Sequence, residues 1–233
     1  QEDEDLLRQY TYLSTDYSST FDTDNIAAFV QFDSQLSQKL SLTTGLRVER
    51  RNSEYNDSEQ LSFDPSDTMV GGKLVLSYQM DENNLFYGSV NRGYKAGGAN
   101  TDGSLPSNLR EFSPEYLWNY ELGYKVSLFD NQAYVRSAVF YMDRDEMQVR
   151  TSYLEEREDG STDFVSYLGN AASGNNIGIE LEAGWQVTTE LEIYGAIGLL
   201  DTEYDGFIDA DGNDKSGDEQ AHAPSYQFNL GLN

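Results

Sequence analysis

Hydrophobic and polar residues alternate along most of the chain, which is the pattern of a β-strand with one apolar and one polar face. Residues 116–128 (YLWNYELGYKVSL) show the pattern most clearly, with a Trp and three Tyr among the residues of one face and Asn, Glu, Gly and Lys on the other. Residues 39–50, 177–187 and 226–233 repeat this alternation. No comparable stretch combines a period of 3.6 residues with helix caps. We therefore predict an all-β chain.

The same pattern, read together with the connections, predicts about ten strands in an up-and-down order. We expect these strands near residues 8–20, 25–36, 39–54, 68–80, 84–95, 115–128, 132–154, 163–187, 190–206 and 223–233. Short polar turns are expected near 34–38, 81–84, 130–132 and 188–190, and long polar loops near 51–67, 96–113, 155–163 and 207–224. Short and long connections alternate strictly, which is typical of an antiparallel transmembrane β-barrel with long extracellular loops and short periplasmic turns.

The lengths of the strands and the placement of charges also favour a membrane barrel. A tilted strand needs roughly 9–11 residues to cross a bilayer, and several predicted strands reach that length. A charge on the lipid side costs roughly 2–4 kcal/mol at the midplane. Glu121 and Lys125 share one face of their strand, which indicates that this face points away from lipid. We predict lipid-side anchors at Trp118, Tyr120, Trp185 and Tyr226, and lumen-wall positions at Arg47, Glu121, Lys125 and Glu180. A soluble sandwich or lipocalin-like barrel, with the aromatic residues in its core, shows the same alternation.

The composition excludes several classes of function and says less about the fold. The formal net charge of −26 over 233 residues argues against a nucleic-acid partner, which needs a basic surface. The chain has no cysteine, so it can form neither disulfides nor thiolate metal sites. No apolar run reaches the roughly 18 residues of a transmembrane helix, and no signal-peptide pattern opens the chain.

Four segments resemble one protein family. Residues 84–100 (NLFYGSVNRGYKAGGAN) resemble the "lYasvsrGyrsGGfN" signature of the barrel domain of TonB-dependent outer-membrane receptors. Residues 27–55 are similar to the hairpin that ends in "tlGlRyer", residues 168–187 to the "Na…s.GvElel" strand, and residues 223–233 to the "aPkytfnlgl" strand. The four segments occur in the family's order and cover nearly the whole chain.

The resemblance implies an organisation and a function. Family members combine an N-terminal plug domain with a barrel of about 22 strands. This chain resembles only barrel segments, so we expect residues 1–233 to form a single partial barrel domain, with the plug and the terminal strands missing. The family imports scarce nutrients, most often a ferric siderophore or other iron complex, with energy from the TonB system. A passive porin-like channel and a soluble ligand-binding β-barrel or sandwich are the alternatives.

The resemblance also implies partners and a location. We expect outer-membrane lipid, the TonB complex (reached through a plug domain that is not in this chain) and a small-molecule or oligosaccharide ligand. We expect a monomer in the outer membrane of a Gram-negative bacterium, with no enzymatic activity.

Residues 92–98 (RGYKAGG) are the most distinctive candidate site, and we predict ligand contacts at Arg92, Tyr94 and Lys95. Two interpretations stay open. In the first, Arg92 and Lys95 attract an anionic siderophore at the barrel mouth. In the second, the glycines relieve crowding where the strand bends into its loop, and Arg92 pairs with carboxylates of the lumen.

Two other features fall short of a catalytic or metal site. Residues 209–220 resemble a calcium loop, but Asp214 and Gln220 occupy the positions at which such a loop has Gly and Glu. We therefore expect a solvated acidic loop there. The single His222 and the absence of HExxH, GxSxG and phosphate-loop motifs predict no catalytic residue, no metal ligand and no cofactor.

Overall fold

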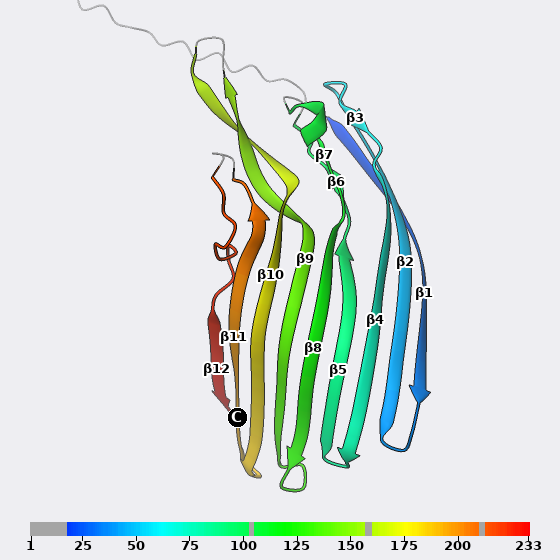
Figure 1. Cartoon of the computed structure of the whole chain (residues 1–233), viewed down its shortest axis with the longest axis vertical. Helices are drawn as coiled ribbons and strands as arrows, with labels where there is room; N and C mark the ends of the chain where they lie inside the picture. The colour runs from blue at the N-terminus through cyan, green and yellow to red at the C-terminus, as the bar shows by residue number, and fades with distance from the viewer. Residues whose placement is uncertain (1–17, 103–104, 157–159, 210–212) are drawn as a thin grey trace, which may run out of the picture.

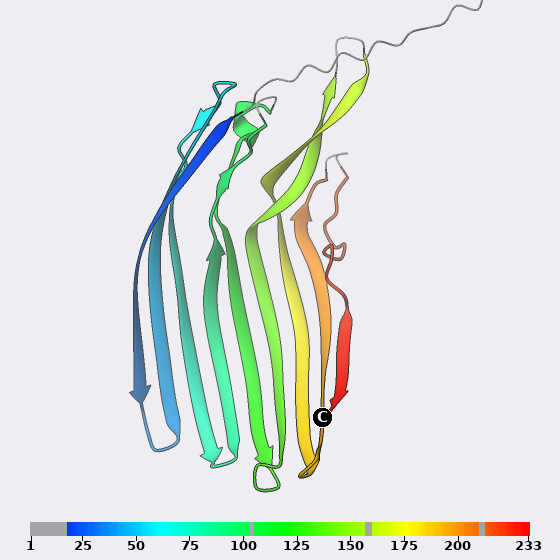
Figure 2. The same cartoon turned by 180° about the vertical axis from the view of Figure 1, so that it is seen from behind.

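The computed structural model describes residues 18–102, 105–156, 160–209 and 213–233. Its long strands form one antiparallel sheet in which neighbours in sequence are neighbours in space (Figures 1 and 2). In order these strands are β1 (Ser19–Gln35), β2 (Leu40–Asp57), β4 (Ser66–Asp81), β5 (Asn84–Lys95), β8 (Glu115–Leu128), β9 (Ala133–Glu156), β10 (Thr162–Thr188), β11 (Leu191–Phe207) and β12 (Tyr226–Leu232). This arrangement confirms the predicted up-and-down order.

Among the described residues, three short strands and one turn of 3₁₀-helix lie at the end of the sheet that carries the long loops (Figure 1). Strand β3 (Ser62–Phe63) pairs with β2. Strands β6 (Gly98–Ala99) and β7 (Glu111–Phe112) pair with each other, and η1 (Ser107–Leu109) lies between them in the chain. Among the described residues, no helix is long and apolar enough to cross a membrane.

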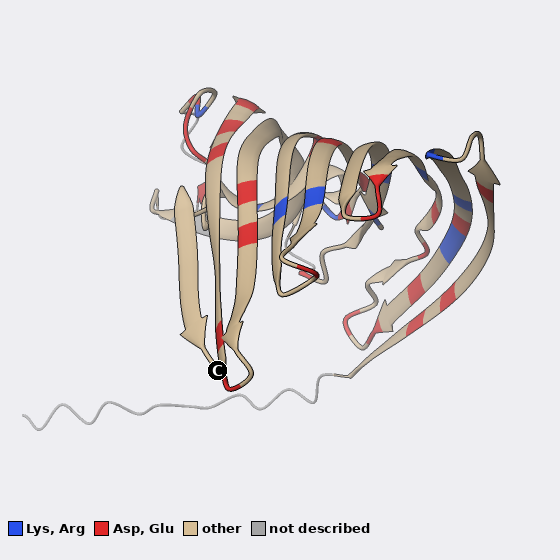
Figure 3. Cartoon of the chain, turned by 90° about the horizontal axis from the view of Figure 1, so that it is seen from below, with Lys and Arg blue, Asp and Glu red and all other residues tan. Residues whose placement is uncertain are grey.

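The sheet curves into an open arch, which Figure 3 shows from below. Its two faces differ in chemistry, because alternate residues of each strand point to opposite sides. The apolar face is the more exposed one: Leu122 is 65% exposed and Ile179 is 50% exposed. Glu121, the neighbour of Leu122 in β8, lies on the other face, where side chains from β5 to β12 line a common cavity. The polar face is therefore concave and the apolar face convex.

Three of the predicted lipid-side anchors lie exposed on the convex face: Trp118, Tyr120 and Trp185 are 38%, 45% and 48% exposed. Tyr226, in the edge strand β12, is 65% exposed and pairs with Leu199, but it also borders the cavity of the concave face. A soluble barrel or sandwich would have packed these rings into a closed interior, so that alternative does not describe this sheet.

The height of the apolar band matches a bilayer. From Trp118 to Leu128 the chain advances ten residues, which is about 33 Å of strand and about 25 Å of height at a tilt of about 40°. An outer-membrane barrel carries an apolar band of about that height between two aromatic girdles. Trp118 stacks on Tyr120 toward the long loops, and Trp185 contacts Phe129 at the short turns. The convex face thus carries aromatic residues at both ends of its band.

Aromatic rings on the concave face lie directly over glycines of neighbouring strands. The ring of Tyr87 covers Gly123, and the ring of Phe140 covers Gly178. Each glycine faces its partner in the register, so the missing side chain leaves the space that the ring fills. In these pairs the aromatic ring lies flat against the sheet, in the space that a side chain at the glycine would occupy.

The structure corrects two of the predicted boundaries. The predicted strand 8–20 falls mostly outside the described residues, but residues 21–24, expected to connect it to the next strand, belong to β1. Strands β9 and β10 also occupy both ends of the predicted loop 155–163, since β9 runs to Glu156 and β10 begins at Thr162. A strand with solvent on both faces needs no alternation of apolar and polar residues, so its ends are not revealed by the sequence pattern.

We predict that Gly178→Val destabilises the protein by about 1–3 kcal/mol, because the added side chain overlaps the ring of Phe140. The measurement is urea unfolding of the whole protein in detergent. Gly198→Val is the matched control, since Gly198 lies on the same face of the next strand and an added Cβ there meets no atom within 4 Å. Equal stability of the two variants would contradict the packing described here.

Candidate functional site

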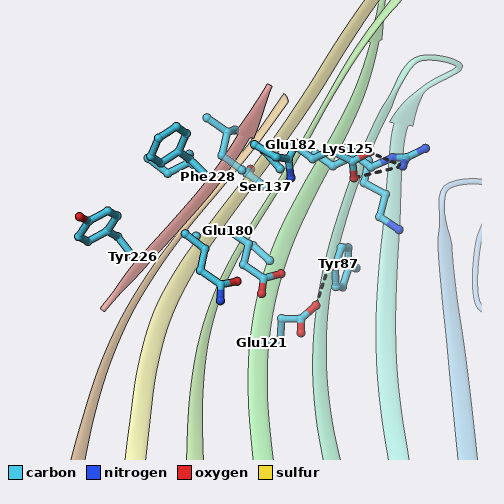
Figure 4. Close-up of a pocket in the computed structure, with 16 residues that line it drawn as sticks. Tyr87, Glu121, Lys125, Ser137, Glu180, Glu182, Tyr226 and Phe228 are labelled. Carbon is cyan, nitrogen blue, oxygen red and sulfur yellow. Dashed lines mark hydrogen bonds and ion pairs between the residues drawn. The ribbon is translucent and has the colours of Figure 1, made fainter. Parts of the chain in front are cut away.

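A cavity of about 690 Å³, lined by charged, polar and apolar residues, lies on the concave face (Figure 4). Strands β5, β8, β9, β10, β11 and β12 line it, so it spans most of the arch. Its charged lining residues are Glu121, Lys125, Arg136, Glu180 and Glu182. Three of these residues, Glu121, Lys125 and Glu180, were predicted to line the lumen. The structure confirms that they lie on the concave face. The wall carries both signs of charge, with an excess of carboxylates.

Hydrogen bonds between strands hold several of these side chains in place. The hydroxyl of Tyr87 donates to Oε1 of Glu121 at 2.6 Å. Glu182 accepts a hydrogen bond from the hydroxyl of Tyr134 at 3.0 Å and forms an ion pair with Arg136 at 3.2 Å. The carboxylates of Glu121 and Glu182 are therefore oriented by neighbouring strands.

The upper part of the concave face holds Tyr94, one of the predicted ligand contacts. Its hydroxyl donates to Oε2 of Glu49 at 3.0 Å and accepts a hydrogen bond from Nε of Arg47, also at 3.0 Å. Arg47, predicted as lumen wall, also forms an ion pair with Glu49. Tyr94 thus connects β5 to β2 across β4, and an added Cβ at Gly71 of β4 would lie 2.9 Å from its ring. Lys95 follows as an exposed residue at the end of β5.

Arg92 lies on the opposite face from the site predicted for it. Its guanidinium stands 4.0 Å over the ring of Tyr116 and 5.8 Å from that of Trp118, and Nη1 donates to the backbone oxygen of Val70. The pairing of β4 with β5 ends at Arg92, which is opposite Gly72. Neither interpretation of the sequence anticipated that Arg92 and Tyr94 would lie on opposite faces of the sheet.

The glycines after Lys95 have a steric role that the second interpretation anticipated. A Cβ at Gly97 would collide with the backbone oxygen of Phe112, and one at Gly98 would lie 2.9 Å from the ring of the same residue. The two glycines therefore allow β6 to approach β7 closely.

A buried polar cluster at the base of the long loops was missed by the sequence analysis. Glu115 is 7% exposed, forms an ion pair with Arg144 and accepts a hydrogen bond from the backbone nitrogen of Gln148 at 3.0 Å. Gln220, also 7% exposed, donates to the backbone oxygen of Glu203 at 2.9 Å and accepts a hydrogen bond from Arg144 at 3.5 Å. The partners lie far apart in the chain, so no local pattern could have identified them.

Side-chain amides fasten the loop between β5 and β8 to the β9–β10 hairpin. The amide of Asn100 bonds to both the nitrogen and the oxygen of Leu168, each at 2.9 Å. The amide of Asn170 bonds in the same way to Ser113, at 2.6 and 2.9 Å. Gln148 adds a bond to the backbone oxygen of Ala96. This loop is therefore a fixed part of the rim.

The acidic loop before β12 provides no group of metal ligands within the part of the chain that the structure describes. Asp209 accepts hydrogen bonds from the backbone and side-chain nitrogens of Asn213. Asp211, another acidic residue of the segment that resembles a calcium loop, lies outside the described residues. Hydrogen bonds from Ser216 lower the pKa of Asp214, so its carboxyl stays ionised to a more acidic pH than usual.

Comparisons with known proteins agree on one family. A family model described as "TonB dependent receptor-like, beta-barrel" matches residues 3–233. The pesticin receptor of Yersinia pestis is 25% identical over 182 residues, which are 75% of this chain and 25% of that receptor. The chain thus spans about a quarter of the length of the curated relatives it matches.

Solved structures show the same fold. The ferric yersiniabactin uptake receptor of Yersinia pestis superimposes with a TM-score of 0.71 at 21% identity, covering 93% of this chain and 32% of that one. The ferric-catecholate import receptor of K12 E. coli gives 0.69 at 18% identity, covering 92% and 32%. The copper transporter OprC gives 0.65 at 12% identity, covering 90% and 32%.

We predict that Asn100→Ala loosens the loop between β5 and β8, because the backbone nitrogen and oxygen of Leu168 lose their partner. The measurement is limited proteolysis of the whole protein, in which cleavage between residues 96 and 113 should become faster. Asn175→Ala is the control, since the side chain of Asn175 is bonded to the exposed Asp205 at the surface. Cleavage at an unchanged rate in Asn100→Ala would show that the amide does not hold the loop.

Proposed function

The chain belongs to the TonB-dependent receptor-like β-barrel family, a family of outer-membrane transport receptors, and from this premise we propose that it is part of the barrel of a nutrient importer. The proposed cargo is a ferric siderophore or other iron complex, and the proposed energy source is the TonB system. We also propose that residues 1–233 are one partial barrel domain of a monomeric receptor in the outer membrane of a Gram-negative bacterium. The plug domain would be supplied by another part of the whole protein.

The observation that carries the proposal is the division of one sheet into a lipid-compatible convex face and a charged concave wall. A transporter needs both, because hydrocarbon surrounds it while a hydrated cargo passes through it. Lys125 and Arg136 stand among carboxylates on that wall, so a cargo meets cations and anions in turn. Contacts that are weak and repeated allow release as well as binding.

The proposal of iron as cargo draws on the similar proteins. Two of the solved structures are described as a ferric yersiniabactin uptake receptor and a ferric-catecholate import receptor. An anionic iron complex suits hydrogen-bond donors and cations at the mouth. Tyr94 and Lys95 stand where β5 ends at the long loops, and we keep both as proposed ligand contacts. Arg92 is left out because its guanidinium lies on the convex face.

We predict that the full-length receptor restores uptake of a radiolabelled ferric siderophore in a strain that lacks its own copy. Hydroxamate, catecholate and mixed-ligand siderophores are tested in turn under iron limitation, with and without TonB. Lys95→Gln should weaken binding of the transported complex about three- to tenfold, because a charge-assisted bond is lost. Lys39→Gln, at the short-turn end of the sheet, should leave binding unchanged. Uptake that persists without TonB would indicate a passive channel, and uptake of none of the complexes would refute iron as the cargo.

A further inference from the structure

The convex face carries a groove of about 820 Å³ that the import function does not use. It crosses β4, β5, β8, β9, β10 and β11 at the height of the apolar band. Its apolar lining includes Leu74, Leu76, Val90, Leu122, Val139 and Ile179. Gly88 lies in its floor, where an added Cβ would be 3.1 Å from Cδ2 of Leu122. The absence of a side chain at Gly88 helps to keep the groove open.

Arg92 stands at the end of this groove that points toward the long loops. On β5 it follows the lining residue Val90 by two positions and therefore shares its face. On β8 the rings under its guanidinium, Trp118 and Tyr116, follow the lining residue Tyr120 in the same direction. A cation, two aromatic rings and an apolar groove thus form one continuous surface on the side that faces lipid.

A guanidinium on the lipid face needs a compensating partner. The cost of such a charge is roughly 2–4 kcal/mol at the midplane and falls to about 0–1 kcal/mol near the interface. Within the described part of the chain, Arg92 makes one hydrogen bond, from Nη1 to Val70. A guanidinium carries five N–H donors, so most of its donors are available to an acceptor outside the protein.

The chemistry of that acceptor follows from the surroundings. Arginine binds phosphate with two parallel hydrogen bonds and stacks on aromatic rings at the same time. The chain as a whole carries a net charge of −26, which repels anionic head groups elsewhere on its surface. A ligand that carries both an anionic group and a hydrocarbon chain can bind Arg92 with the first and fill the apolar groove with the second. A soluble phosphate could bind Arg92 but would leave the groove unfilled.

We propose that this surface binds one phosphate-bearing lipid of the leaflet on the long-loop side. The phosphate lies on Arg92, above the rings of Tyr116 and Trp118, and an acyl chain lies in the groove over Gly88. The lipid is a partner of the outer wall and is separate from the imported cargo. This inference depends on the faces of the sheet and not on the identity of the nutrient.

The test is a titration of the full-length receptor in detergent, followed by native mass spectrometry. The probes are diphosphoryl lipid A, the same lipid without its phosphates, and inorganic phosphate as a competitor. The unaltered protein should prefer the phosphorylated lipid, and inorganic phosphate at the same concentration should not displace it. Arg92→Gln should bind the phosphorylated lipid about tenfold more weakly and lose the preference. Gly88→Val fills the groove and should weaken binding of both lipids.

Lys73→Gln is the control for loss of a positive charge, since Lys73 lies on the concave face of the neighbouring strand, against Gly45. It should bind both lipids as the unaltered protein does. Arg92→Lys keeps the charge but loses the planar fork, so its affinity should lie between those of the unaltered protein and Arg92→Gln. An unchanged preference in Arg92→Gln, unchanged binding in Gly88→Val, or displacement by inorganic phosphate would overturn the proposal. So would a receptor dimer that forms through this face and excludes the lipid.

Discussion

The structure depends on one constraint: a backbone that crosses hydrocarbon must satisfy its N–H and C=O groups within the protein. The chain meets this requirement by pairing each long strand with its neighbours in sequence, from β1 to β12. Once the backbone is paired, alternate side chains are committed to opposite faces, one against lipid and one against water. The division into a convex apolar face and a concave polar wall is a direct consequence of that pairing.

A wall of this kind has almost no dry core, so rigidity must come from elsewhere. Among the described residues the largest side chains that are fully buried are Met69 and Leu105. Small clusters stand at the long-loop end, such as the stacked rings of Tyr55 and Phe63, 4.7 Å apart. The ion pair of Glu115 with Arg144 and the amides that hold the loops lie at the same end. Local packing and buried polar bonds therefore support the rim.

Strand β5 links the two proposed activities of the wall. Tyr94 contributes to the concave face through Glu49 and Arg47, while Arg92, two residues earlier, lies over aromatic rings on the convex face. The ladder between β4 and β5 stops at Arg92, and that break lets the end of the strand reach across β4. In the two proposals, the motif that resembles the family signature therefore contributes Tyr94 to the import path and Arg92 to the lipid-binding surface.

The sequence alone determined the order of the strands, the faces of Trp118 and Glu121, and the separation of long loops from short turns. Period-two alternation is local, and the bilayer enforces it wherever a strand crosses, so it can be read without knowing which strands pair. Only the tertiary structure decided that the predicted loops 51–67 and 96–113 carry the short strands β3, β6 and β7, because their pairing follows no alternation along the chain. It also decided that Tyr94, two residues after Arg92 on β5, reaches the concave face, because the ladder between β4 and β5 ends at Arg92. The partners of Glu115 and Gln220 come from distant strands, and only the register of the folded sheet brings them together.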